Sequence, residues 1–270
     1  MGRFDRKVAL ITGAARGQGR AHAVKLAGEG ADIIALDLCS QIDSVPYPLA
    51  TTGDLAETVS AVERLDQRIF AAEADVRDFA AVSAAVKNGL AELGRIDVVI
   101  ANAGIAPHSV DEKDPIQVFE DTLAVNLTGV RHTVHAVIDT LIEQGEGGSI
   151  IITSSTAGLT ARGGTGTGAC DGYVASKHAV VGLMRSWANW LAPHRIRVNT
   201  IHPTGVDTPM VTNDAMAAYL EANPGGATNL LDVALIEAVD LANAAAWLAS
   251  DEARYVTGVA LPVDAGFTAK

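Results

Sequence analysis

Short apolar runs alternate with longer stretches of helical period along the whole chain. The runs are of strand length and consist mostly of Val, Ile, Leu and Ala, which is typical of strands buried on both faces of a parallel sheet. This alternation predicts an α/β fold with one doubly wound parallel sheet of about seven strands, flanked by helices on both faces. The predicted strands span 8–12, 32–36, 69–76, 96–101, 149–155, 195–201 and 259–263.

The stretches between these runs predict the helices. The first helix follows a glycine turn and continues through Leu26, and the next two are expected to begin with Asp54 and Asp78 as capping residues. Because no linker interrupts the pattern, we expect a single domain over residues 1–270. The later helices are predicted over 54–67, 78–94, 115–144, 173–192 and 235–250.

Polar residues and glycines gather where the predicted strands end. In a parallel sheet all carboxyl ends lie at one edge, and ligands of such sheets bind there. We therefore expect the binding site at this edge. The residues that fall there are Gly13, Asp37, Asp75, Asn102, Ser155 and Pro203.

The segment 12–19 (TGAARGQG) lies between the first predicted strand and the first predicted helix. Glycine lets the backbone approach a pyrophosphate, and the free N–H groups at a helix start supply donors and positive potential. A glycine-rich turn without a ligand is the alternative. Strand, glycine turn and helix together are the context that a dinucleotide fingerprint requires.

Asp37 ends the second predicted strand, 18 residues after Gly19 (37 − 19 = 18). A carboxylate there can accept both ribose hydroxyls of an adenosine and repels a 2′-phosphate, so it favours NAD over NADP. Arg16 indicates the opposite preference, because a cation beside the glycine turn could bind that phosphate. We give Asp37 the greater weight, although an ordinary strand-end cap is the alternative for it. Asp75, at the end of the third predicted strand, could accept from an adenine amino group.

Tyr173 and Lys177 are four residues apart and would lie on one face of a helix, about one turn apart. A free phenol has a pKa of about 10 and is a poor base at neutral pH. An adjacent ammonium group favours the phenolate, and bringing the pKa of Tyr173 to neutrality requires roughly 4 kcal/mol from Lys177 and its surroundings. The pair predicts a general base, although the same spacing also occurs on solvated helices without a function.

Two stretches are long for connections in an α/β fold. Residues 38–53 carry Pro46 and Pro48, which exclude a regular helix, and they follow the strand that ends at Asp37. We expect this insertion to cover the cofactor, with a surface loop of no role as the alternative. Residues 211–232 have weak periodicity and a Pro224-Gly225-Gly226 breaker, so a mobile substrate lid is expected over 207–232.

The chain has 270 residues, with 20 Lys and Arg against 32 Asp and Glu, which gives a net charge of −12. This balance argues against nucleic acid or an anionic membrane as a partner. Cys39 and Cys170 form no disulfide framework, and His132 and His135 lack a clear third ligand, so no metal site is predicted. With no signal-peptide pattern and no apolar run of ~20 residues, we expect a soluble, cytoplasmic protein.

From about Asp5 to Phe267 the chain resembles the short-chain dehydrogenase/reductase family. The resemblance rests on the glycine pattern of 12–19, Asn102-Ala103-Gly104, Asn126, Ser154-Ser155 and Tyr173-x-x-x-Lys177, in this order. It implies a Rossmann-type fold and four catalytic residues. Their implied roles are the general base (Tyr173), the holder of the substrate oxygen (Ser155), the anchor of a proton-relaying water (Asn126), and the ligand of the nicotinamide ribose that depresses the pKa of the base (Lys177).

The resemblance also implies NAD as the cofactor, held along the predicted edge. Val206 and Thr208 match positions that grip the nicotinamide carboxamide. The full predicted cofactor set is Gly13, Arg16, Gly17, Gln18, Gly19, Asp37, Leu38, Asp75, Val76, Asn102, Ala103, Gly104, Tyr173, Lys177, Pro203, Gly205, Val206, Thr208 and Met210.

A finer resemblance is to the mycofactocin-associated branch of the family, whose named members include carveol dehydrogenases. It rests on residues 37–43 (DLCSQID) and on Pro46-x-Pro48. The branch implies NAD that is held without exchange and electrons that pass to a peptide-derived redox carrier, mycofactocin. The chain departs from the family in its 18-residue interval between Ser155 and Tyr173 (173 − 155 = 18), in Gln18, and in Pro203-Thr204-Gly205.

Together these features predict an NAD-dependent enzyme that oxidises a small, apolar, terpenoid-like secondary alcohol to a ketone. An NADPH-dependent ketoreductase is the alternative that Arg16 favours. A nicotinamide-sensing regulator without catalysis is a further alternative; such a protein would be expected to lose one of the four catalytic residues, and all four are present. By family analogy we expect a homotetramer.

Overall fold

The computed structural model describes residues 2–160, 164–224 and 228–269. Within them, seven strands form one sheet in the order β3-β2-β1-β4-β5-β6-β7, and every neighbouring pair is parallel. The predicted doubly wound, Rossmann-like fold is therefore confirmed. The strands are β1 (Val8–Thr12), β2 (Asp32–Asp37), β3 (Ile69–Glu73), β4 (Val98–Ala101), β5 (Gly148–Thr153), β6 (Ile196–Pro203) and β7 (Ala260–Val263).

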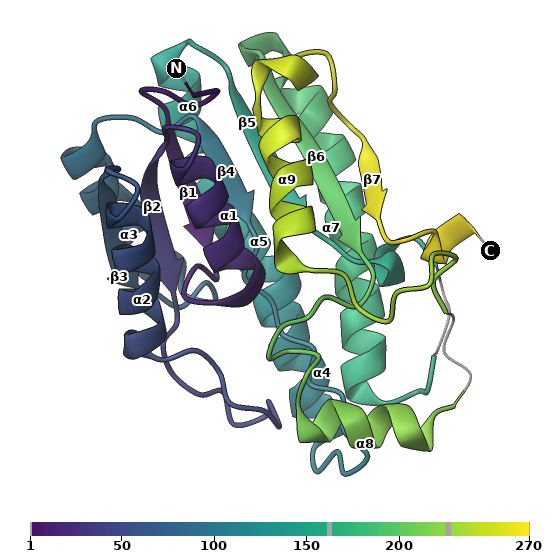
Figure 1. The fold of residues 1–270 in the computed structure, drawn as a ribbon. Helices are drawn as coiled ribbons and strands as arrows, with labels where there is room; N and C mark the ends of the chain where they lie inside the picture. Colours follow the sequence, from purple (N-terminus) through teal and green to yellow (C-terminus); the bar gives the residue numbers. More distant parts are fainter. Residues whose placement is uncertain (1, 161–163, 225–227, 270) are drawn as a thin grey trace.

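Helices cover both faces of this sheet (Figure 1). Because successive side chains of a strand point to opposite faces, Ala9 and Ile11 of β1 pack into one core and Val8 and Leu10 into the other. The first core is completed by α1 (Gly17–Ala27), α2 (Thr52–Glu63) and α9 (Ala238–Ala249). The second contains α3 (Phe79–Leu93), α5 (Val130–His135), α6 (Ile138–Gln144) and α7 (Gly168–Leu191).

Capping side chains set the helix starts. As predicted, Asp78 caps α3 by accepting from the backbone N–H groups of Ala80 and Ala81. The prediction for α2 is wrong by three residues at its start, because Thr51 is the N-cap and Asp54 is the third residue of a capping box. This helix also ends at Glu63, earlier than predicted.

The predicted single helix over 115–144 is also wrong. The chain forms α4 (Pro115–Leu123), a π-helical segment (Ala124–Gly129), α5 and α6. In the π-helical segment the Asn126 amide pairs with the backbone of Ile105, donating to its carbonyl and accepting from its N–H at 2.8 Å each. π-helical turns are frequent at functional sites, and this one supports the chain that follows β4.

Helix α7 begins five residues before Tyr173. Thr167 accepts from the N–H of Cys170, and the Glu112 carboxylate accepts from the N–H groups of Gly168 and Ala169 at 2.8 and 2.7 Å. Gly168 passes Pro115 so closely that a Cβ atom would lie 1.9 Å from the Pro115 oxygen. Tyr173 therefore lies inside a regular helix, not at its start.

The remaining differences concern connections. Strand β3 ends at Glu73, so Asp75 and Val76 follow it in a turn. The predicted lid contains α8 (Asp214–Ala222), which Asn213 caps. Gly163, in the interval between Ser155 and Tyr173, and Gly225-Gly226 of the predicted breaker lie outside the described residues. In the described part of the chain, no helix has both the length and the apolarity to cross a membrane.

His22 of α1 has no exposed surface, and neither ring nitrogen has a hydrogen-bond partner among the described residues. Burial lowers the pKa of His22 from 6.5 to about 4. The unfolded chain therefore binds more protons than the folded chain between these two pH values. Stability is fully present above about pH 6.5 and falls as the pH decreases toward 4.

Replacing His22 by Leu should remove this dependence. Through His22 alone the wild type loses on the order of 2 kcal/mol of unfolding free energy between pH 7.5 and pH 5. Urea unfolding at both pH values measures the difference, with the exposed His194→Leu variant as the control. Equal pH slopes for wild type and His22→Leu would show that this histidine is not held neutral.

Candidate active site

A cleft lies at the carboxyl edge of the sheet, between residues 38–53, the ends of β1, β4 and β5, and the chain after β6. It encloses about 1250 Å³, part of which is open to solvent. Of the predicted site residues, Gly19, Asn126 and Gly205 do not line it. Those that line it are Gly13, Arg16, Gly17, Gln18, Asp37, Leu38, Asp75, Val76, Asn102, Ala103, Gly104, Ser155, Tyr173, Lys177, Pro203, Val206, Thr208 and Met210.

The first turn of α1 meets this cleft without a capping side chain. Arg16 is the N-cap but makes no side-chain hydrogen bond to the turn, and no acidic residue lies in the first turn. The first N–H groups of the helix therefore keep their donor capacity for a ligand. Gln18 Oε1 is also buried without a partner among the described residues. The turn thus has the donors and the potential of an anion site.

Glycine is required in this turn for two reasons. Gly13 and Gly17 have φ angles of +67° and +55°, which favour glycine. A Cβ atom on Gly19 would lie 1.9 Å from the Gly13 oxygen. Gly19 therefore lets the helix start approach β1, which explains its absence from the cleft lining. Gly205 likewise faces Leu235, whose Cδ2 would lie 2.8 Å from an added Cβ.

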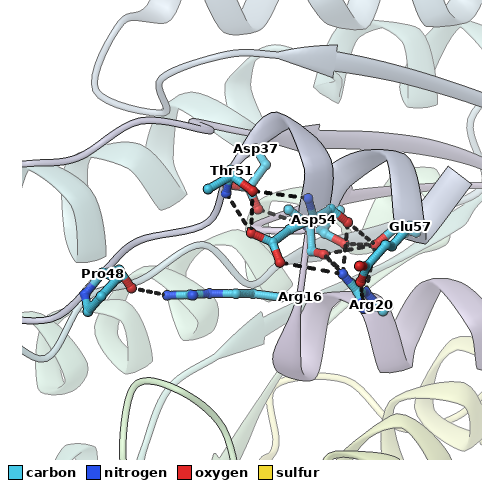
Figure 2. A network of polar contacts seen from close by, with 10 residues as sticks. Arg16, Arg20, Asp37, Pro48, Thr51, Asp54 and Glu57 are labelled. Carbon is cyan, nitrogen blue, oxygen red and sulfur yellow. Dashed lines mark hydrogen bonds and ion pairs between the residues drawn. The ribbon is translucent and has the colours of Figure 1, made fainter. Parts of the chain in front are cut away.

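Asp37 accepts from the backbone N–H groups of Ala15, at 2.8 Å, and Cys39, at 3.5 Å. Burial raises the pKa of Asp37, and these backbone hydrogen bonds oppose the rise. Arg16 donates to the Pro48 carbonyl, and Figure 2 shows its side chain extended toward the insertion. The cation that could have bound a 2′-phosphate is therefore engaged with residues 38–53.

Asp75 lines the cleft but pairs with Arg77, at 2.7 Å. Partial burial raises the pKa of Asp75, but the hydrogen bonds and the charge of Arg77 lower it by more. The pKa of Asp75 is therefore below its ordinary value. Arg77 also lies 3.5 Å from Asp121 of α4. Asp75 is thus a charged acceptor held in place, and its predicted contact with an adenine stays a prediction.

Lys177 and Tyr173 lie together on one face of α7, as their spacing predicts. Lys177 is 4% exposed, its Nζ donates to the Thr153 carbonyl at 2.9 Å, and it lies 5.5 Å from the centroid of the Tyr173 ring. Burial lowers the pKa of Lys177 to about 8. Its positive charge is therefore already disfavoured by its surroundings.

We expected the surroundings of Tyr173 to lower its pKa, but the protein's own groups raise it. Burial raises the pKa of the Tyr173 phenol, and the hydrogen bond with the Ser155 hydroxyl lowers it by less. Lys177 does not offset this rise, because its Nζ donates to the Thr153 carbonyl and is buried together with the phenol. A further positive charge is needed before the phenolate is favoured.

The Ser155 hydroxyl accepts from the N–H of Ala157 at 3.1 Å. His202 of β6, which our sequence analysis did not single out, contacts the Ser155 carbonyl through Nδ1 at 2.7 Å. Both the oxygen and the nitrogen of the Asn126 side-chain amide are hydrogen-bonded to the backbone of Ile105. The side chain therefore positions the chain after β4. Its implied role as a water anchor stays a prediction.

Residues 38–53 are packed against the rest of the chain. Ile42, Val45 and Tyr47 are at most 5% exposed and form an apolar cluster with Val76, Ile105 and Val125. The Gln41 side chain holds the insertion from within, donating to the carbonyls of residues 42, 45 and 47 and accepting from the N–H of residue 49.

Sequence reasoning missed Tyr47, which lines the cleft and whose hydroxyl accepts from the N–H of Ala106 at 3.1 Å. An aromatic residue between two prolines, in an insertion expected to cover a ligand, was the available signal. The two histidines of α5 make contacts within the chain. His132 contacts the Val76 carbonyl at 2.9 Å, and His135 packs against Trp187 and Trp190.

Residues 7–217 match the family model described as short chain dehydrogenase. The chain is 56% identical to an uncharacterised oxidoreductase of Mycobacterium tuberculosis, over 99% of this chain and 98% of that protein. It is 45% identical to the (-)-trans-carveol dehydrogenase of Rhodococcus erythropolis over 100% of both. The solved carveol dehydrogenase from Mycobacterium avium in complex with NAD is 48% identical, covers 100% of both chains and has a TM-score of 0.93. The chain therefore belongs to the short-chain dehydrogenase/reductase family.

Proposed function

We propose that this protein is an NAD-dependent dehydrogenase that oxidises a small, apolar, terpenoid-like secondary alcohol to a ketone. The observation that carries the proposal is one cleft in which Tyr173, Ser155 and Lys177 lie beside the uncapped start of α1. The similarity to two carveol dehydrogenases, one of them in complex with NAD, supports both the cofactor and the type of substrate.

The residues of the cleft fit NAD. The free N–H groups at the start of α1 suit a pyrophosphate, and the unpartnered Gln18 Oε1 can accept a hydrogen bond from a ligand. Asp37 suits the hydroxyls of an adenosine ribose, and Arg16 is engaged by Pro48. This engagement weakens the alternative of an NADPH-dependent ketoreductase.

Tyr173 takes the proton of the alcohol hydroxyl, and Ser155 hydrogen-bonds to the same substrate oxygen. The hydrogen bond between the Tyr173 and Ser155 hydroxyls supports this, because an oxygen close to both can bind both. NAD, when bound, supplies the hydride acceptor and a positive nicotinamide ring. Since burial raises the pKa of the phenol, Tyr173 works as a base only where such a charge accompanies Lys177.

Residues 38–53 would retain the NAD between turnovers. Three polar contacts tie this insertion to separate elements, namely Tyr47 to Ala106, Ser44 to Asp121 at 2.7 Å, and Arg16 to Pro48. Release of the cofactor from beneath it would break these contacts and expose the apolar cluster. Electrons would then leave through an external carrier, for which the mycofactocin resemblance indicates a peptide-derived molecule.

The remaining parts of the proposal concern assembly and access. Residues 207–232, with α8 among them, serve as the lid over the substrate. The protein works in the cytoplasm as a homotetramer, by analogy with its family.

Replacing Tyr173 by Phe should remove the base and leave the ring in place. We expect kcat to fall by about 10²–10⁴-fold, while the amount of co-purified NAD, measured by mass spectrometry, stays that of the wild type. Tyr255→Phe is the control, because Tyr255 is 88% exposed. Near wild-type oxidation of carveol by Tyr173→Phe would overturn the assignment of the base.

Replacing Lys177 by Met should change the pH dependence of stability as well as activity. The folded pKa of about 8 lies below the ordinary lysine pKa of 10.5, so the unfolded chain binds more protons between these values and stability rises with pH across this range. From pH 7 to pH 9.5 the unfolding free energy of the wild type should rise by about 2 kcal/mol more than that of Lys177→Met.

Chemical denaturation at the two pH values measures this difference, with Lys87→Met, at an exposed position, as the control. The Lys177→Met variant should also lose alcohol oxidation, because the cation beside the base is gone. A parallel rise of stability in wild type and Lys177→Met would contradict the burial of this charge.

Replacing Tyr47 by Phe tests the retention of NAD. The change keeps the ring in its apolar cluster and removes the hydrogen bond to Ala106. Loss of one hydrogen bond of about 1 kcal/mol should accelerate the dissociation of NAD by roughly fivefold. The dissociation rate is measured by exchange of bound NAD for labelled NAD, with Tyr255→Phe as the control. An unchanged rate in Tyr47→Phe would show that the contact with Ala106 does not retain NAD.

A further inference from the structure

A pair of stacked aromatic rings connects the lid helix α8 with Tyr173. His108, from the chain after β4, stacks on Tyr219 of α8 with ring centroids 4.9 Å apart and planes inclined by 25°. His108 also meets the ring of Tyr173 edge-on, at 5.7 Å and 64°. The stacked pair of His108 and Tyr219 is thus in contact with the residue that we place at the centre of the chemistry.

The surroundings of this pair hold it in position. Glu112, four residues after His108, accepts from two N–H groups at the start of α7, so the chain that carries His108 is tied to the helix that carries Tyr173. On the other side, the Tyr219 hydroxyl lies 3.4 Å from Thr165 Oγ1, and Tyr219 is 9% exposed. Helix α8 lies at the end of the molecule where α4 and α7 begin (Figure 1).

The pair also limits the space beside Tyr173. The described residues that line the cleft near Ser155 and Tyr173 include Pro209 and Val211, but none from α8 and none from 107–114. The rings of His108 and Tyr219 are therefore not part of the cleft lining; they lie next to the cleft, where His108 contacts the ring of Tyr173 and connects it with Tyr219 of α8. His108 Nδ1 is buried and has no partner among the described residues, and burial lowers the pKa of this ring to about 4, so the wall is uncharged at neutral pH.

We propose that His108 and Tyr219 are specificity-determining residues, whose stacked rings form a flat wall that admits monocyclic secondary alcohols to Tyr173 and excludes polycyclic ones. Uncharged aromatic side chains next to Tyr173 offer apolar surface against which an alicyclic ring can pack. A fused second ring would have to enter the space that the pair fills. This inference rests on the proposed function, because it names the substrates that the same site accepts.

The test uses the full-length protein with its bound NAD and two alcohols, carveol as the monocyclic probe and a hydroxysteroid as the polycyclic probe. The variants are His108→Ala and Tyr219→Ala, which remove one ring each from the pair, and Tyr255→Ala, which removes a ring that is 88% exposed and lies outside the cleft lining. Turnover is followed with an artificial electron acceptor, and equilibrium binding of each alcohol is measured by calorimetry.

For the two alanine variants, we expect kcat/KM to rise by about tenfold or more for the hydroxysteroid and to fall by about tenfold for carveol through a higher KM. Tyr255→Ala should stay within about twofold of the wild type for both probes. Wild-type selectivity in both alanine variants, or an equal loss for both alcohols, would overturn the proposal.

The outcome separates this proposal from the proposed function. If the wild type oxidised neither alcohol, the proposed function would fail, while calorimetry would still test the wall. The proposal is supported if the wild type binds carveol and if the hydroxysteroid binds only after either ring is removed. Equal hydroxysteroid binding by all four proteins contradicts it.

Discussion

Lys177 carries an ammonium group into the interior, and the elements around it are locked together where it lies. Its Nζ donates to the Thr153 carbonyl at the end of β5, and the Ser154 hydroxyl donates to the Lys177 carbonyl at 2.9 Å. Gly158 passes so close that an added Cβ would lie 2.5 Å from that same carbonyl oxygen. These contacts fix the end of β5 and the following turn against α7. They thereby place Ser155 beside Tyr173.

This close packing is the reason why we propose that Tyr173 needs a charge from outside the chain to act as a base. Burial works against the charged forms of both side chains, lowering the pKa of Lys177 and raising that of Tyr173. A dry site strengthens every remaining electrostatic interaction, so a positive nicotinamide placed there has a large effect on the phenol. In our account the insertion 38–53 and the lid keep the site dry around this ring.

The sequence predicted most of the sheet and the local motifs, because these depend on residues near one another in the chain. β1 was predicted to the residue, and the spacing of Tyr173 and Lys177 places them on one helix face without knowledge of the rest. The early start of α7 was missed because Glu112, far away in the sequence, caps it. The break in the helix over 115–144 was missed because Asn126 bonds to Ile105, which no local period reveals. For Tyr47 the position between two prolines was a local signal, but its contact with Ala106 exists only in the folded chain.

We propose that the positive charge of the cofactor, together with Lys177, turns the buried Tyr173 phenol into a base. This proposal is tested most directly by titrating the Tyr173 phenol by ultraviolet difference absorbance, with the spectrum of Tyr173→Phe subtracted, while the bound NAD is either oxidised or reduced by excess alcohol. Our account predicts that the phenolate forms at a lower pH with oxidised NAD than with reduced NAD. Ionisation of Tyr173 at the same pH in both states would contradict it.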